Sequence, residues 1–417
     1  MSNFNEILGE RLKKLRAQDL YRELRWIDSP PGRLLQTGTQ ILLNFASNDY
    51  LGLANEPALK EAAKKAVERY GAGAGASRLI TGSVTPQSEL EEALTQFKGT
   101  EAALSFGSGY AAAQGAIVAL ISKQDLVIVD RLVHACIVDA TRLSGATLRV
   151  FAHNDVADLE HVLEKAQTKR AGTGNTLIIT ESVFSMDGDH APLRELVLLK
   201  ERYGAWLMVD EAHATGLYGP HRRGLAEELG VADHIEVQMG TLSKALGAAG
   251  GYICGSRALV DLLINRARPF IFSTAPVPAA AAAATAGIRF VQSVAGEERR
   301  KRLWTRAREL SQLIGFSEDR LSAIRPLVVG DERRAMEQAA ALRARGFLVP
   351  AIRFPAVAHG SARLRLTLSA SHTAEDVQLL AQTLLELGLA PGHGQNGQSA
   401  SQCASPLPVS EGLSNDA

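Results

Sequence analysis

The chain has 417 residues, with 45 Lys and Arg against 45 Asp and Glu, so its formal net charge is zero. This balance argues against a general nucleic-acid binder, which needs surplus positive charge to neutralise phosphates. Hydrophobic residues make up 46% of the chain. That value is ordinary for a globular protein, and the length allows two or three domains.

The sequence predicts no membrane span and no signal peptide. The most apolar run, residues 275–287, is mostly alanine and contains two prolines, and residues 1–25 mix both charge signs. Cys136, Cys254 and Cys403 lie far apart, and no pair has the spacing of a metal site or a disulfide framework. We therefore expect a cytoplasmic protein with no membrane partner and no metal.

The first predicted element is a helix over residues 3–25, where apolar residues recur at near-helical spacing. A short strand is expected over residues 41–46. These elements form an N-terminal segment over residues 1–47, ahead of the first domain. A helix over residues 57–70 follows and ends at the glycine-rich run 71–75.

Helices and strands alternate from about residue 85. Helices are expected over 87–97 and 111–120, and strands over 102–106, 125–129, 176–180, 206–209 and 235–239. Strands that are apolar on both faces and alternate with helices predict a mostly parallel sheet covered on both sides. We expect an α/β domain over residues 48–289.

The pattern changes near residue 290. Helices are expected from residue 297 onward, over 332–345 and over 374–387, with strands over 323–329, 348–352 and 364–368. This mixture predicts a smaller α+β domain over residues 290–390. Residues 391–417 are rich in Gly, Ser, Gln, Asn and Pro, and we expect this tail to be disordered.

Residues 107–112, with the sequence GSGYAA, lie between a predicted strand and a predicted helix. Glycines let backbone amides approach an anion, and the start of a helix favours negative charge. The same residues fit the dinucleotide fingerprint, with Asp130 near the distance expected of a ribose-binding acid. A nicotinamide-dependent oxidoreductase and a plain tight turn therefore both stay open.

Asp210 and Lys244 each follow an apolar strand. An aspartate there can bind a ring nitrogen, bind a metal or cap a helix. A lysine among small residues can form a Schiff base with an aldehyde, or can simply be solvated. An anion cradle, an acid and a lysine at the ends of sheet strands together suit pyridoxal phosphate (PLP). His134, after the strand 125–129, could stack on its ring or be structural.

Five motifs in order carry a resemblance to a known family: NFASNDYLG (44–52), FSMDGD (184–189) followed by APL (191–193), DEAH (210–213), TLSK (241–244) and RLRLT (363–367). They resemble the α-oxoamine synthases, which are PLP-dependent enzymes of the aspartate-aminotransferase fold, fold type I. The resemblance covers about residues 5–390. It implies an α/β large domain, a smaller C-terminal domain and a homodimer with its sites at the interface.

The resemblance also implies residue roles. Lys244 would form the Schiff base and move the substrate proton, Asp210 would hold the pyridine nitrogen, and His134 would stack on the ring and face the substrate. The ring hydroxyl and phosphate contacts implied are Ser185, His213, the amides of Gly109 and Tyr110, Thr241, and, from the partner subunit, Ser273 and Thr274. Asn48 and Arg365 would orient the amino-acid substrate, and Glu181 would lie near the ring.

Two further arginines, Arg353 and Arg22, match the family member of biotin biosynthesis, which condenses L-alanine with a pimeloyl thioester of coenzyme A or a carrier protein. Ala356 departs from that pattern, because a threonine is common at this position. Glycine C-acetyltransferase and 5-aminolevulinate synthase share most motifs and remain alternatives. A non-catalytic subunit of the family should lack Lys244, which is present.

Overall fold

The computed structural model describes residues 3–170, 174–317 and 321–390. The chain forms two compact units. Unit 1 comprises Met1–Ser47, Thr305–Leu368 and His372–Ala417, and unit 2 comprises Asn48–Trp304 and Ser369–Ser371. The expected tail, residues 391–417, lies outside the described residues.

The division near the C-terminal domain falls at residues 304 and 305, inside helix α12 (Val294–Ile314), rather than at the expected residue 290. The first half of α12 is anchored on unit 2. Arg299 donates to the carbonyl of Leu51 at 3.0 Å and pairs with Glu56 at 2.8 Å. Arg300 donates to the carbonyl of Gly219 at 2.9 Å. These contacts explain why the helix belongs to both units.

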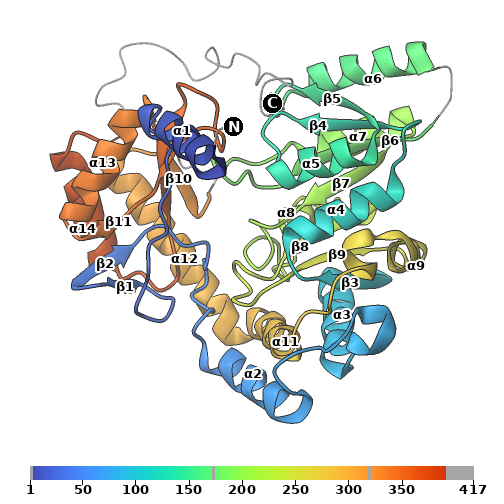
Figure 1. Ribbon diagram of the computed structural model, residues 1–417, viewed down its shortest axis with the longest axis horizontal. Helices are drawn as coiled ribbons and strands as arrows, with labels where there is room; N and C mark the ends of the chain where they lie inside the picture. Colours follow the sequence, from blue (N-terminus) through green and yellow to red (C-terminus); the bar gives the residue numbers. More distant parts are fainter. Residues whose placement is uncertain (1–2, 171–173, 318–320, 391–417) are drawn as a thin grey trace. The chain divides into compact units, whose positions relative to one another are not determined.

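A seven-stranded sheet forms the centre of unit 2 (Figure 1). Its order is β3 (Ala102–Phe106), β9 (Gly251–Gly255), β8 (Val237–Thr241), β7 (Trp206–Asp210), β6 (Thr176–Glu181), β4 (Leu126–Asp130) and β5 (Thr147–Phe151). Only β9 runs antiparallel to its two neighbours. The expected mostly parallel α/β sheet is confirmed.

Both faces of this sheet are buried, which explains the continuous apolar runs. On one face, Val127, Ile179 and Met239 belong to a core with side chains from α4 (Gly109–Leu120), α5 (Ala135–Ser144), α9 (Arg257–Arg266) and α10 (Arg268–Ile271). Side chains alternate along a strand. Their neighbours Ile128 and Ile178 therefore point to the other face, and they are equally buried.

The remaining elements of unit 2 are mostly helical. They are α2 (Pro57–Tyr70), the π-helix η1 (Arg78–Gly82), α3 (Thr85–Lys98), α6 (Val156–Arg170), α7 (Leu193–Tyr203), α8 (Leu225–Glu228), the 3₁₀ turn η2 (Ala232–His234) and α11 (Pro278–Gln292). The alanine-rich run 275–287 begins α11, which packs against α2 and α3. Among the described residues, no helix is both long and apolar enough to cross a membrane.

Unit 1 is α+β. One sheet has the order β1 (Leu34–Thr37), β2 (Gln40–Asn44) and β11 (Phe347–Leu348), and the other has β10 (Ile324–Gly330), β13 (Ala362–Thr367) and β12 (Ala351–Ile352). Its helices are α1 (Phe4–Ala17), α13 (Glu332–Ala344) and α14 (Ala374–Glu386). The N-terminal helix is thus shorter than the expected 3–25.

The single strand expected over residues 348–352 is wrong. The segment forms two short strands, β11 and β12, which join different sheets. Pro350 lies between them and has no N–H to continue a ladder. Its carbonyl instead accepts from the N–H of Arg365 at 3.0 Å.

Candidate active site

Four parallel strands of unit 2 place the candidate residues at one edge of the sheet. Strand β4 leads to His134, β6 ends at Glu181, β7 ends at Asp210, and β8 ends at Thr241, three residues before Lys244. The register pairs Glu181 with Asp210 directly. Carboxyl ends of parallel strands form the usual ligand-binding edge of an open α/β sheet.

Lys244 belongs to a chain of hydrogen bonds. Its Nζ lies 2.8 Å from Nε2 of His213, and Nδ1 of His213 lies 2.6 Å from the hydroxyl of Tyr50. The Tyr50 hydroxyl donates to Oδ1 of Asn48 at 3.2 Å. When Lys244 donates to Nε2, the proton of His213 sits on Nδ1 and the donors follow one direction to Asn48. The sequence had not singled out Tyr50, although it lies in the motif 44–52.

Asp210 is a buried acid, 5% exposed. One carboxylate oxygen accepts from the N–H of Ala212 at 2.9 Å. Burial raises the pKa of Asp210, and the nearby Lys244 opposes that shift. An anion at this depth needs a cationic or proton-carrying partner. A protonated ring nitrogen would be such a partner.

Glu181 is also buried, and the backbone N–H groups of His134 and Ser185 donate to its carboxyl group. Its Oε1 has no hydrogen-bond partner among the described residues. Burial, together with the charge of Asp210, raises the pKa of Glu181 to about 8. The site therefore holds a carboxyl group that keeps its proton near neutral pH. Ser185, whose N–H it fixes, is 9% exposed.

His134 caps the N-terminus of α5, where its Nδ1 accepts from the N–H of Cys136 at 3.2 Å. The residue is exposed, yet partial desolvation of the ring lowers its pKa, with Lys244 adding to that effect. The neutral ring then carries its proton on Nε2. An exposed, neutral imidazole beside Asp210 and Lys244 can lie against a flat ligand.

The glycine-rich loop forms a cradle at the start of α4. A Cβ added at Gly109 would lie 3.7 Å from Cβ of Thr241, so the two residues are neighbours. A Cβ at Gly251 would come within 2.5 Å of the carbonyl of Ser108, which explains the glycine there. The Thr241 hydroxyl bonds to Ser243 and to the carbonyl of Gly250, both at 2.8 Å. Together with the first amides of α4, this is an anion-binding geometry.

Tyr110 contributes its backbone to the same turn, whereas its hydroxyl donates to Asp139 at 2.6 Å. The dinucleotide alternative does not fit this loop. Asp130 is fully buried and already accepts hydrogen bonds from His153, Leu132 and Asn154. Strand β3 also pairs only with the antiparallel β9 and not with β4.

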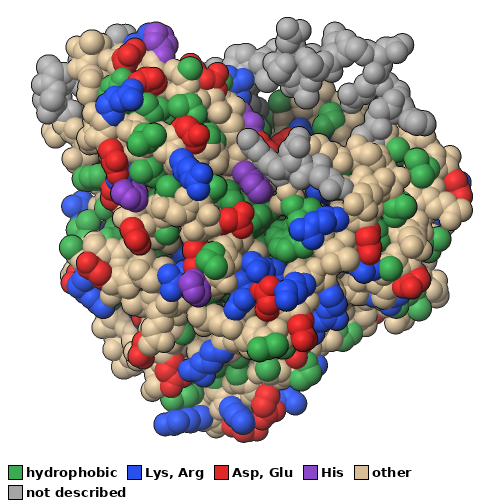
Figure 2. Space-filling model, turned by 180° about the vertical axis from the view of Figure 1, so that it is seen from behind, with side chains coloured by type: hydrophobic (Ala, Val, Ile, Leu, Met, Phe, Trp, Pro, Cys, Tyr) green, Lys and Arg blue, Asp and Glu red, His purple; other side chains and the backbone are tan. Residues whose placement is uncertain are grey.

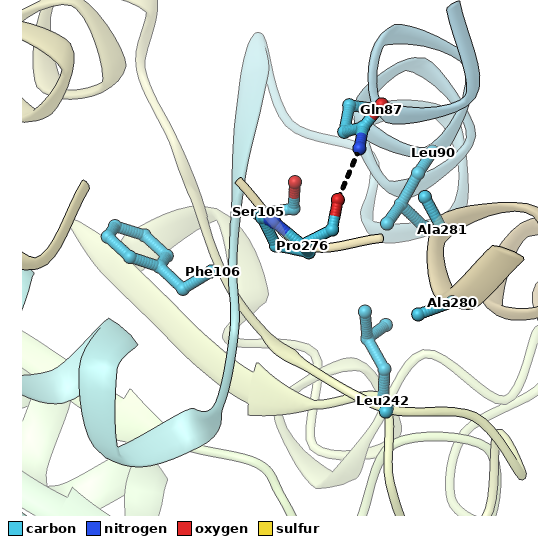
Figure 3. Close-up of a pocket in the computed structure, with 9 residues that line it drawn as sticks. Gln87, Leu90, Ser105, Phe106, Leu242, Pro276, Ala280 and Ala281 are labelled. Carbon is cyan, nitrogen blue, oxygen red and sulfur yellow. Dashed lines mark hydrogen bonds between the residues drawn. The ribbon is translucent and has the colours of Figure 1, made fainter. Parts of the chain in front are cut away.

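Ser273 and Thr274 lie on the surface of unit 2, and both are exposed. Thr274 bridges to Ser77, and the side chain of Gln87 donates to the carbonyl of Pro276 at 2.7 Å (Figure 3). A small pocket lies beside this bond, with Leu242 of the 241–244 segment on its far side. Ser273 and Thr274 are therefore held at the surface by a segment whose next residue, Ala275, is buried.

Arg22, Arg353 and Arg365 belong to unit 1. Arg22 donates to the carbonyl of Phe354 at 2.9 Å, and Arg353 donates to the carbonyl of Tyr21 at 2.8 Å. Burial lowers the pKa of Arg353, and the neighbouring Arg22 contributes to this shift. The two arginines thus form one basic pair. Arg365, on β13, is 4% exposed.

Most of the chain is similar to known proteins. A model of the family described as aminotransferase class I and II matches residues 40–384. The 8-amino-7-oxononanoate synthase of Anaeromyxobacter dehalogenans is 48% identical over 374 residues, which cover 89% of this chain and 92% of that protein.

Two solved structures are also similar. The serine palmitoyltransferase of S. paucimobilis, with a bound adduct of PLP and myriocin, has a TM-score of 0.85 at 30% identity, covering 92% of this chain and 97% of that one. An 8-amino-7-oxononanoate synthase from Francisella tularensis has a TM-score of 0.69 at 27% identity, covering 83% of this chain and 98% of that one.

Proposed function

Because the chain belongs to the aminotransferase class I and II family, in the branch of the 8-amino-7-oxononanoate synthases, we propose that its site condenses L-alanine with a pimeloyl thioester. The enzyme is a PLP-dependent, decarboxylating C-acyltransferase of biotin biosynthesis. Its products are 8-amino-7-oxononanoate, carbon dioxide and the free thiol of coenzyme A or a carrier protein.

The residues present fit PLP. A cradle lacking side chains at Gly109 and Gly251, a buried anion at Asp210 and an amine at Lys244 lie at one sheet edge. The α4 amides and Thr241 would hold the phosphate, and Asp210 would hold the proton of the ring nitrogen. His134 would lie on the ring, with Ser185 and His213 at its hydroxyl group. When bound, PLP supplies an electron-withdrawing ring that stabilises negative charge on the substrate carbon.

The single observation that carries the mechanism is the 2.8 Å contact between Lys244 and His213. Lys244 Nζ removes the α-proton of L-alanine, and the same nitrogen returns a proton to that carbon after carbon dioxide leaves. The chain through His213 and Tyr50 to Asn48 fixes the position and hydrogen-bonding direction of this amine.

We propose that arginine side chains select the substrates by binding their carboxylates. Arg365 binds the carboxylate of L-alanine through a planar fork, with Asn48 orienting the amino acid. Arg22 and Arg353 bind the free carboxylate at the far end of the pimeloyl chain. Their support is mutual proximity, since each donates to the backbone beside the other. Acetyl and palmitoyl donors carry no such carboxylate.

We further propose a cytoplasmic homodimer in which Ser273 and Thr274 reach the phosphate bound by the partner subunit. Both residues are exposed, and Gln87 anchors the neighbouring Pro276. Large apolar side chains are exposed around it, with Phe272 at 70% and Ile80 at 75%. Exposed apolar side chains of this size mark protein–protein surfaces.

The purified protein tests this proposal directly. With PLP bound, it is expected to absorb visible light, and L-alanine is expected to change that spectrum. Adding a pimeloyl thioester should release one carbon dioxide and one thiol for each molecule of 8-amino-7-oxononanoate detected by mass spectrometry. A protein that binds PLP and L-alanine but releases no carbon dioxide would contradict the proposed reaction.

A further inference from the structure

A charged cluster outside the proposed cofactor contacts joins three loops of unit 2. His153 follows β5, Asp130 ends β4, and Asp189 lies between β6 and α7. Nδ1 of His153 lies 2.9 Å from Oδ1 of Asp130, and Nε2 lies 2.7 Å from Oδ2 of Asp189. Neither carboxylate nor the imidazole has a role in the reaction described above.

The geometry defines the charge of the ring. An ionised carboxylate can only accept hydrogen bonds, so each ring nitrogen that faces one must carry a hydrogen. When both Asp130 and Asp189 are ionised, His153 is an imidazolium. Burial alone lowers the pKa of His153, but its hydrogen bonds to Asp130 and Asp189, together with their negative charges, outweigh this effect and raise the pKa to about 10.

The two aspartates also hold loops that carry proposed cofactor residues, Asp130 through its carboxylate and Asp189 through its backbone carbonyl. Asp130 accepts from the N–H of Leu132 at 2.8 Å, within the loop that leads to His134. The carbonyl of Asp189 accepts from the N–H of Phe184 at 3.0 Å, next to Ser185. The ring of His153 packs edge-on against Phe184, with centroids 4.4 Å apart.

Asn154 completes the cluster. Its N–H donates to Asp130 and its Nδ2 donates to Asp189, both at 2.8 Å. Its backbone has a φ of 55°, in the left-handed region that few residues other than glycine adopt. Such strained conformations persist where surrounding contacts fix them, often beside functional sites.

We propose that His153 is a positioning residue for cofactor binding, whose imidazolium ties together the loops that place His134 and Ser185. The proposal rests on the proposed function only in that these two residues contact PLP. Without the positive charge, Asp130 and Asp189 would keep their hydrogen bonds from Asn154 but lose those from the imidazolium, and the two carboxylates would repel each other. Both loops would then be free to shift.

The test compares His153→Gln with His161→Gln, a matched change at an exposed position of α6. Apo protein is titrated with PLP and binding is followed by absorbance, alongside the melting temperature of the apo protein. We expect His153→Gln to weaken PLP binding by about tenfold, the scale of one lost charge-assisted hydrogen bond. The His161 variant should bind like the parent. A folded His153→Gln with parental affinity overturns the proposal, even if its melting temperature falls.

Two measurements keep the proposal testable if His153→Gln does not fold. Asp189→Asn removes one of the two charges, and it should also weaken PLP binding. Where all variants fold, the double variant should lose less affinity than the sum of the single changes, because both break one contact. Additive losses would contradict the proposal.

Nitrogen NMR of histidine-labelled apo parent should show two protonated ring nitrogens for His153 at pH 8. A single protonated ring nitrogen on His153 would also contradict the proposed imidazolium. A parent that binds no PLP would instead count against the proposed function.

Discussion

Glu181 and Asp210 end neighbouring parallel strands, are paired in register, and are both buried. Two adjacent buried carboxyl groups resist carrying two negative charges, so one of them retains a proton. Lys244 favours the ionised form of both groups, and Asp210 gains further from the N–H of Ala212 and from His134, whereas burial and the charge of Asp210 raise the pKa of Glu181 to about 8. Glu181 is therefore the member of the pair that stays protonated.

On the surface drawn in Figure 2, acidic and basic side chains are interspersed, unlike the two adjacent carboxyl groups of the buried pair.

Glu181→Gln should change how stability depends on pH. The pKa of Glu181 is raised from 4.5 to about 8 in the folded protein. Its ionisation cost is thus absent below pH 4.5, grows as the pH rises towards 8, and is constant above that. The glutamine variant lacks this component. We expect the free energy of unfolding of the variant, relative to the parent, to rise between pH 5 and pH 8, as measured by urea titration. Parallel pH curves for the two proteins would contradict the assigned proton.

Lys244→Ala should fold but fail to hold PLP covalently, because the amine at the end of β8 is gone. Borohydride reduction of the parent, followed by peptide mass spectrometry, should find the cofactor attached at Lys244. The exposed Lys123 supplies a control, and Lys123→Ala should label like the parent. Cofactor attached to another lysine of the parent would remove Lys244 from its role.

Asp210→Asn should retain PLP and lose most turnover. An amide cannot hold a proton on the ring nitrogen as an anion does, so the ring withdraws electrons less well. A loss of about 2–4 kcal/mol in the barrier would lower turnover by roughly 30- to 1000-fold. Steady-state kinetics at saturating PLP measures it. Turnover close to the parental value would mean that Asp210 only supports the fold.

The ion pair between Lys98 and Glu211 should contribute to the stability of the folded protein. The pair is fully buried at 2.6 Å, and Lys98 also donates to the carbonyl of Arg223. Burial lowers the pKa of Lys98, but the attraction and hydrogen bond of Glu211, together with Tyr252 and Cys254, outweigh burial and raise the pKa overall. Lys98→Met leaves a buried charge unpaired and should cost about 3–5 kcal/mol in urea unfolding. The double variant with Glu211→Gln should cost clearly less. Equal losses in the two variants would show that packing, not charge, sets the effect.

The sequence predicts the central sheet well, because buried parallel strands read as continuous apolar runs. The strand at 126–130 and the helix at 57–70 are found almost to the residue. Strand β5 is missed because it lies at the sheet edge and exposes Thr147 and Arg149, so its pattern is not apolar. Strand β9 is short and bounded by glycines, which hides its antiparallel pairing.

The sequence predicts those site residues whose side-chain chemistry suits PLP and which follow an apolar strand, as Lys244 and Asp210 do. The contacts that support these residues cannot be predicted from the sequence. Tyr50 reaches His213 across 163 positions, and Asp130 reaches His153 across 23. Neither spacing follows a helical or strand period, so only the folded sheet brings the partners together. The sequence spacing of Asp130 fits a ribose-binding acid, but in the structure Asp130 binds His153, Leu132 and Asn154.

The central claim is that this site joins L-alanine to a pimeloyl thioester. The most direct measurement pairs alanine, glycine and serine with acetyl, succinyl and pimeloyl thioesters, and determines kcat/KM for each combination from thiol release. We expect L-alanine with the pimeloyl donor to exceed every other pair by at least about tenfold, the scale of one charge-assisted contact to the distal carboxylate. Faster turnover of glycine with an acetyl or succinyl donor would contradict the claim and assign the chain to a sister reaction of the same family.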